Sequence, residues 1–161
     1  MQLKPAFLKE LMQNALAEAK RAASFGEVPV GAVVTHGKEI IAVGRNEMEL
    51  RSDPTAHAEV LAIRRAAQLL GNWRLSESIL CVTLEPCTMC MGAIRLARVP
   101  VVVFGARDER MGAAGSLYDL SLDSRLGEGP RLISGICEKE AAQILSEFFQ
   151  NRRDTRAEIL Q

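Results

Sequence analysis

Two short motifs that lie far apart in the chain restrict its fold more than any other feature. The first is His-Ala-Glu at positions 57–59, and the second is Pro-Cys-Thr-Met-Cys at positions 86–90. One imidazole and two thiols are common ligands of zinc, so a fold that uses all three must bring both motifs to one place. The intervening residues have room for one helix and one strand, and a helix-strand-helix unit can bring its two ends together.

The residues before the first motif predict a helix and a hairpin. Apolar residues recur at helical spacing over positions 8–22, and this helix should end near Gly26. Positions 28–35 and 39–44 are rich in β-branched residues, and Gly37 lies between them. Glycine tolerates the positive φ of a tight turn, so these two strands should be antiparallel neighbours.

The two motifs themselves should each lie at the start of a helix. Asp53 followed by Pro54 is typical of an N-cap with proline at the first helical position, so a helix should run from there to about Leu69 and carry His57 in its first turns. Positions 79–84 form a nearly continuous apolar run, which predicts a buried central strand.

The rest of the chain continues the alternation of helix and strand. A third helix should start at Pro86 and end near Arg98, and positions 101–105 predict another buried strand. Positions 131–136 are a possible fifth strand, and a closing helix is expected over 141–149. Before the fifth strand, the chain from 121 to 130 resembles a loop.

The predicted fold class is α/β, with a three-layer α/β/α sandwich around a central mixed sheet of five strands. The 161 residues are 48% hydrophobic, which is enough for one core and too short for two typical domains. We therefore expect residues 1–161 to form a single domain.

The charge balance excludes strong bulk attraction to nucleic acid. Twenty basic residues offset twenty acidic ones, so any binding of RNA must depend on a local patch. The N-terminus lacks a signal-peptide core, and no stretch approaches about 18 uninterrupted apolar residues. These features favour a cytoplasmic protein without a membrane partner, in which the four cysteines are thiols or metal ligands rather than disulfides.

The chemistry of the two motifs points to a catalytic zinc ion. Cys87 and Cys90 are three residues apart, so a helix presents them on one face, and its N-terminus favours thiolates. Together with His57 they leave the fourth tetrahedral position free for water, which is the mark of a catalytic rather than a structural site. Glu59 could reach that water as general base and then general acid. His-x-Glu with Pro-Cys-x-x-Cys is the known signature of zinc-dependent nucleobase deaminases.

Longer segments carry a more specific resemblance. The sequences DPTAHAEVLAIR, NWRL, VTLEPCTMCMGAI and FGARDERMGAAGSL closely resemble those of the bacterial tRNA-specific adenosine deaminases, and the likeness extends from EVPVGAVV to SEFFQNRR. The resemblance implies a cytidine-deaminase-like fold with one Zn²⁺ per subunit. It also implies a homodimer that converts the wobble adenosine of an arginine tRNA anticodon to inosine.

The resemblance also assigns roles to residues. It implies that His57, Cys87 and Cys90 bind zinc and that Glu59 transfers protons. Residues that would bind the substrate are Val30, Asn46, Ala58, Arg107, Asp108, Phe149, Arg152 and Arg153. These types suit the task, because a flipped base needs apolar walls, a ribose hydroxyl needs a polar partner, and phosphates need cations such as Arg110.

Several of these residues also have plainer interpretations. Asn46 could cap a turn after the second strand, and the glycine-rich segment 105–116 could be an ordinary surface loop. Arginines that follow Phe148, including Arg156, also suit a helix C-terminus in general. We expect His36 to be a solvated turn residue.

The remaining thiols and thioethers are expected to have structural roles. Cys81 and Cys137 lie in or beside apolar strands, where a buried free thiol is the usual state. Met89 and Met91 flank a proposed ligand, and methionines in such positions commonly fill gaps in packing.

Two other functions compete with tRNA editing. A deaminase of a free nucleobase or nucleoside, such as guanine or cytosine, would use the same metal and the same glutamate. The segment 105–116 and the arginine-rich C-terminus favour RNA, because a small substrate needs no phosphate-binding rim. The second alternative is a non-catalytic, zinc-stabilised binding module, and Glu59 argues against it because such a module has little need of a proton shuttle.

Overall fold

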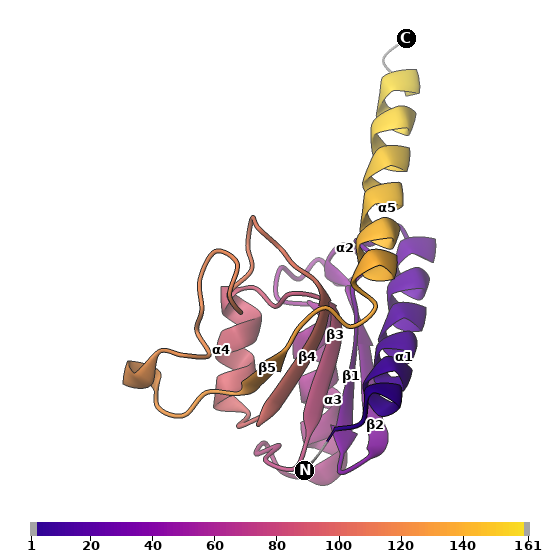
Figure 1. Ribbon diagram of the computed structural model, residues 1–161. Coiled ribbons are helices and arrows are strands. Elements are labelled where there is room, and N and C mark those ends of the chain that lie inside the picture. Colours follow the sequence, from indigo (N-terminus) through magenta and orange to yellow (C-terminus); the bar gives the residue numbers. More distant parts are fainter. Residues whose placement is uncertain (1–2, 160–161) are drawn as a thin grey trace.

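The centre of the molecule is a mixed five-stranded sheet. The computed structural model describes residues 3–159, with side chains described up to residue 155. In spatial order the strands are β2 (Glu39–Arg45), β1 (Gly31–His36), β3 (Ile79–Leu84), β4 (Val101–Ala106) and β5 (Arg131–Ile133). β1 is antiparallel to both of its neighbours, whereas β3, β4 and β5 are mutually parallel (Figure 1).

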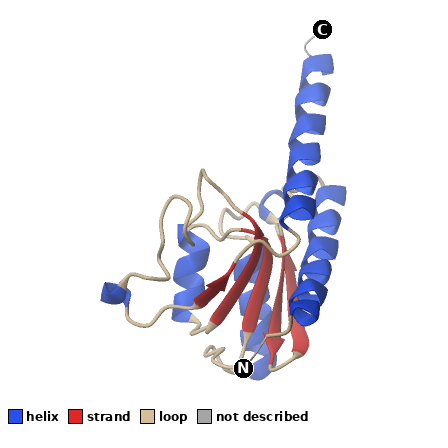
Figure 2. Ribbon diagram, viewed as in Figure 1, coloured by secondary structure: helices blue, strands red, loops and turns tan. Residues whose placement is uncertain are grey.

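Helices cover both faces of this sheet (Figure 2). α1 (Pro5–Ser24) and α5 (Glu138–Ile159) pack on one face, and α3 (Ala58–Leu70) and α4 (Thr88–Leu96) pack on the other. Each face has its own apolar core. The expected three-layer α/β/α sandwich with a mixed five-stranded sheet is therefore confirmed.

The predicted hairpin and central strands are also confirmed. β1 and β2 are joined at Gly37, whose φ of +59° gives the tight turn that glycine favours. β3 lies between β1 and β4, and its first five residues are buried. A strand covered on both faces has no polar side, which explains the apolar run that predicted it.

The starts of the two motif helices differ from the prediction. α3 begins at Ala58 rather than at Pro54, because the Asp53 carboxylate accepts hydrogen bonds from the N–H and the hydroxyl of Thr55 and closes a separate turn. α4 begins at Thr88 rather than at position 86 and ends at Leu96. A short helix, α2 (Met48–Arg51), precedes this turn and was not predicted.

The C-terminal elements differ in length from the prediction. β5 ends at Ile133, so the fifth strand is shorter than expected. α5 begins before position 141 and continues well past Phe149, and its last turns project beyond the rest of the molecule (Figure 1). Residues 121–130 form a loop with one turn of 3₁₀ helix at Ser124–Leu126, as expected. No helix within residues 3–159 has the length and apolar character needed to cross a membrane.

Candidate active site

The two sequence motifs meet at the N-termini of α3 and α4. His57 is the N-cap residue of α3 and Cys87 that of α4, both with extended backbone, and Cys90 lies in the first turn of α4. The Nδ1 atom of His57 is 3.7 Å from the Sγ of Cys87 and 3.5 Å from the Sγ of Cys90. The three ligand atoms all lie within 4.8 Å of one another, so the group is able to hold a metal ion.

The spacing of these atoms matches a tetrahedral zinc site. Zinc lies about 2.0 Å from an imidazole nitrogen and about 2.3 Å from a thiolate, so tetrahedral angles put the two ligand atoms about 3.5 Å apart. The observed nitrogen–sulfur distances of 3.5 and 3.7 Å are close to this value. The chemistry and spacing of these three residues therefore fit a zinc ion.

The ionisable ligands perturb one another strongly. The hydrogen bond from Cys90 lowers the pKa of Cys87 to about 4, and His57 acts in the same direction against the effect of burial. That shared hydrogen bond and burial raise the pKa of Cys90. The pKa of His57 is raised chiefly by its hydrogen bond with Cys87. Shared protons thus link His57, Cys87 and Cys90 by hydrogen bonds, and the deprotonated thiols and imidazole would bind a cation.

Glu59 faces this group from the second position of α3. Only 4% of its surface is exposed, and burial is the main cause that raises its pKa to about 7. A carboxyl group with such a pKa takes up and releases protons near neutral pH, as a general acid–base catalyst requires.

A pocket of about 170 Å³ opens beside these residues. It is lined by Val28, Val30, Asn46, Met48, His57, Ala58, Glu59, Leu84, Glu85, Cys87, Asp108 and Met111. The structure thus places the predicted Val30, Asn46, Ala58 and Asp108 around the proposed metal ligands. The pocket is below the size of typical sites for drug-sized ligands, so it suits one small planar group better than a whole nucleotide.

Five of the lining residues were not predicted from the sequence, namely Val28, Met48, Leu84, Glu85 and Met111. A signal was available for some of them. Val28 lies two residues before Val30, and alternate residues of an extended segment share one side. Leu84 and Glu85 directly precede the second motif.

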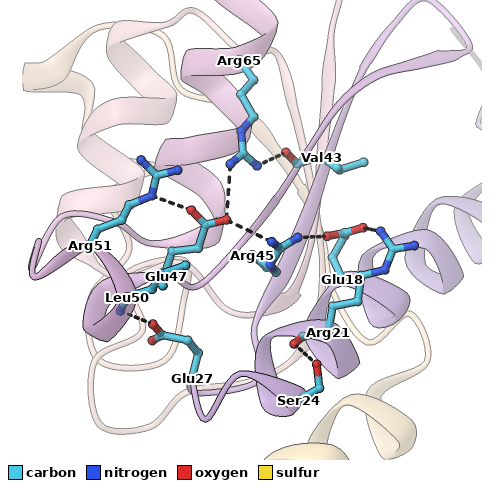
Figure 3. Close-up of polar contacts among 10 residues, drawn as sticks. All are labelled: Glu18, Arg21, Ser24, Glu27, Val43, Arg45, Glu47, Leu50, Arg51 and Arg65. Atoms are coloured by element: carbon cyan, nitrogen blue, oxygen red, sulfur yellow. Dashed lines mark hydrogen bonds and ion pairs between the residues drawn. The ribbon is translucent and has the colours of Figure 1, made fainter.

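Asn46 occupies the corner between β2 and α2. Its Nδ2 donates a hydrogen bond to Glu27, whereas its buried Oδ1 has no partner within residues 3–159. The following residue, Glu47, pairs with Arg45, Arg51 and Arg65 and ties this corner to β2 and α3 (Figure 3). Because Asn46 lines the pocket, this buried oxygen is available to accept a hydrogen bond from a ligand.

Other predicted contacts lie outside the pocket. Arg107 and Arg110 are exposed on the loop after β4. Phe149 is 43% exposed on α5, and nearby Arg152 stacks over the Phe148 ring at 5.2 Å. Arg153 donates to Gln150, and the side chain of Arg156 lies outside the described residues. Their contact with RNA stays a prediction.

The remaining histidine and cysteines are not part of the site. His36 is exposed next to Glu77, as expected, but it is the last residue of β1 rather than part of the turn. Cys81 is a buried free thiol whose pKa is raised by burial, and Cys137 is a partly buried one. Met91 is fully buried in the core between the sheet and α4, which confirms its packing role.

Comparisons with known proteins agree with this geometry. The family model of the MafB19-like deaminases matches residues 8–153. The tRNA-specific adenosine deaminase of Haemophilus influenzae is 46% identical over 92% of this chain and 86% of its own length. A structure from a study of A-to-I editing by tRNA:A34 deaminases, at the wobble position of transfer RNA, covers 84% of this chain and 99% of its own, with 42% identity and a TM-score of 0.81.

A deaminase of a free base is also similar. The guanine deaminase of Bacillus subtilis is 41% identical, with a TM-score of 0.58, but the match covers only 61% of this chain and 63% of that one. The likeness to the tRNA deaminases extends over much more of both chains. The protein therefore belongs to the MafB19-like deaminases and, within them, to the tRNA-specific adenosine deaminase family.

Proposed function

We propose that this protein hydrolyses the 6-amino group of an adenosine in tRNA, at the wobble position of the anticodon, and yields inosine and ammonia. The observation that carries the proposal is the buried Glu59 beside an open His57, Cys87 and Cys90 group, in a pocket with room for one base. Family membership supplies the class of substrate.

His57, Cys87 and Cys90 would hold one Zn²⁺ per subunit. The support for this is the match between their spacing and tetrahedral zinc geometry, together with a ligand count that leaves one position open. When bound, the ion supplies an activated water at that position.

Glu59 moves the protons of the reaction. Its carboxylate takes a proton from the attacking water, and the resulting acid returns a proton to the amino group that leaves as ammonia. Glu85, another carboxylate in the pocket, cannot share this role, because both of its oxygens accept hydrogen bonds from the loop after β4.

The pocket admits the target base and leaves the rest of the RNA outside. Val30 and Ala58 supply apolar walls, and Asn46 and Asp108 supply polar contacts at its edge. The phosphates and flanking bases would meet Arg107, Arg110, Phe149, Arg152 and Arg153.

Family resemblance adds further proposals for the whole protein. We expect residues 1–161 to act as a single zinc-dependent deaminase domain that is a homodimer and acts on an arginine tRNA. Because tRNA is the proposed substrate, we expect the protein in the cytoplasm.

Nucleoside mass spectrometry tests the function directly. Zinc-loaded protein is incubated with an anticodon stem-loop that contains a wobble adenosine, and free adenosine, guanine and cytidine are run in parallel. Inosine from the stem-loop alone is the expected result. Turnover of a free base alone would contradict tRNA editing and favour a function like that of the guanine deaminase relative.

Replacement of the proton shuttle tests the mechanism. Glu59→Ala should retain zinc and folding and lose inosine formation by at least about 100-fold. Glu10→Gln, on the exposed surface of α1, is the control and should keep full activity. A Glu59→Ala protein with undiminished turnover would exclude the assigned role.

A further inference from the structure

Glu85 is a buried carboxylate that the proposed reaction does not use. It directly follows β3, and only 2% of its surface is exposed. Its Oε1 accepts hydrogen bonds from the N–H groups of Ala114 and Ser116, each at 3.0 Å. Its Oε2 accepts one from the Asp108 N–H at 3.0 Å and another from the Ser116 hydroxyl. All four donors belong to residues 107–116, here called the pocket loop.

The pocket loop closes tightly on this carboxylate. A Cβ atom at Gly112 would lie 2.5 Å from the Cδ of Glu85 and 2.4 Å from the carbonyl oxygen of Asp108. The N–H of Ala113 donates to the carbonyl oxygen of Pro86 at 2.8 Å. The loop is therefore anchored at both the side chain of Glu85 and the backbone that leads into α4.

This anchoring determines the shape of one pocket wall. Asp108 and Met111 come from the pocket loop and line the pocket together with Glu85. The Asp108 carboxylate also accepts hydrogen bonds from the N–H groups of Arg110 and Met111, which fixes the turn between them. A wall that is ordered before binding avoids the entropy loss that a mobile loop would suffer on contact with RNA.

We propose that Glu85 is a positioning residue, which holds the pocket loop as a preformed wall so that Asp108 and Met111 meet the target nucleoside in place. This proposal rests on the proposed function, because the substrate is the RNA of that reaction. It predicts that loss of the carboxylate affects binding of substrate more than the chemical step.

Glu85→Gln tests the proposal, since an amide must turn its NH₂ group toward N–H donors at one of the two oxygen positions. The KM for the anticodon stem-loop should rise about ten-fold or more, with a smaller change in kcat and full zinc content. Cleavage by trypsin after Arg107 and Arg110 should accelerate, because these exposed arginines would lie on a mobile loop. Glu10→Gln is again the matched control.

Gly112→Ala disturbs the contact between the pocket loop and the Glu85 carboxylate from the side of the loop. This variant replaces Glu85→Gln in the test if Glu85→Gln loses zinc. It should show the same rise in KM and the same sensitivity to trypsin. Wild-type KM and trypsin resistance in both variants, or a defect confined to kcat, would overturn the proposal. If the wild-type protein forms no inosine, the proposed function fails, whereas the trypsin experiment still decides whether Glu85 holds the loop.

Discussion

His57 and Cys87 occupy equivalent positions, because each precedes the first turn of a helix. An extended N-cap residue can turn its side chain across the helix N-terminus, whose partial positive charge favours a thiolate. The sequence predicted the residue types of the site but placed His57 inside a helix. The reason is that Asp53 and Pro54 look like a helix start, whereas Asp53 in fact closes a turn with Thr55.

Replacement of a motif cysteine should lower the metal content of the protein, whereas replacement of another cysteine should not. Cys90→Ala removes one of three proposed ligands, so bound zinc should fall from one per chain to near zero after dialysis against a weak chelator. Cys137→Ala is the control, because this thiol lies apart from the group and should leave zinc unchanged. Equal metal content in both variants, measured by atomic emission, would refute the ligand assignment.

Element boundaries were predicted best where burial produced a clear apolar pattern in the sequence. The run that became β3 is apolar because both faces are covered, and its limits matched. α5 was predicted too short because its residues 150–155 are polar and exposed, so no apolar stripe marks them. From its glycines alone the pocket loop could be an ordinary surface loop, because the carboxylate that anchors it lies in a distant segment of the sequence.

The close packing of α3 on the sheet depends on Gly44 of β2. A Cβ atom there would lie 2.2 Å from the carbonyl oxygen of Ala58, the first residue of α3, and 2.8 Å from the nitrogen of Ala62. Gly44→Ala should therefore push away the helix start that carries His57 and Glu59. We expect a loss of about 1–3 kcal/mol in unfolding free energy and weaker zinc binding.

Gly31→Ala provides the matched control for this element. Its Cβ would lie 2.0 Å from the carbonyl oxygen of Ala15 in α1, on the opposite face of the sheet. A comparable loss of stability with unchanged zinc affinity is expected, as measured by urea unfolding and by competition with a chromophoric chelator. If both variants lost zinc affinity equally, general destabilisation would be responsible rather than the packing of α3 on the sheet.

Glu47, in the corner between β2 and α2, should make the unfolding free energy depend on pH. Burial works to raise the pKa of Glu47, but Arg51 and Arg65 outweigh it, so the pKa lies below its usual 4.5. A lowered folded-state pKa stabilises the protein above about pH 4.5, and this contribution disappears as pH falls through the folded value. Glu47→Gln should thus be less stable than wild type at pH 7, by about 1–2 kcal/mol.

The same difference should shrink in acid, when the wild-type carboxylate becomes protonated. Urea unfolding at pH 7, 4 and 3 measures this difference in unfolding free energy. Any bound metal is lost from both proteins alike at low pH, so it does not affect the comparison. Glu39→Gln, an exposed glutamate of β2, should match wild type at every pH. A gap between wild type and Glu47→Gln that stays constant from pH 7 to 3 would show that Glu47 contributes through shape rather than charge.

At the scale of the whole molecule, the sequence predicted the layers but not the shape of the pocket. The alternation of elements suffices for an α/β/α sandwich, whereas the pocket combines Val28, Met48 and Leu84 from separate segments whose meeting depends on strand order. That order puts β1 next to β3, and no local pattern in the chain specifies it. The projecting end of α5 was also not predicted, and it carries Arg152 and Arg153, two of the proposed RNA contacts.

Because the net charge is zero, the arginines on the projecting end of α5 should contribute measurably to RNA binding. Because acidic and basic residues balance, general attraction cannot supply RNA affinity, and local cations such as Arg152 and Arg153 must provide it. The double variant Arg152→Ala/Arg153→Ala should bind the anticodon stem-loop more weakly, and the slope of log affinity against log salt should fall by about 1–2. Lys9→Ala/Lys38→Ala removes the same charge from exposed sites on α1 and the hairpin turn, and it should leave the slope unchanged. Equal slopes for both double variants, measured by fluorescence anisotropy between low and physiological salt, would mean that α5 does not contact the phosphates.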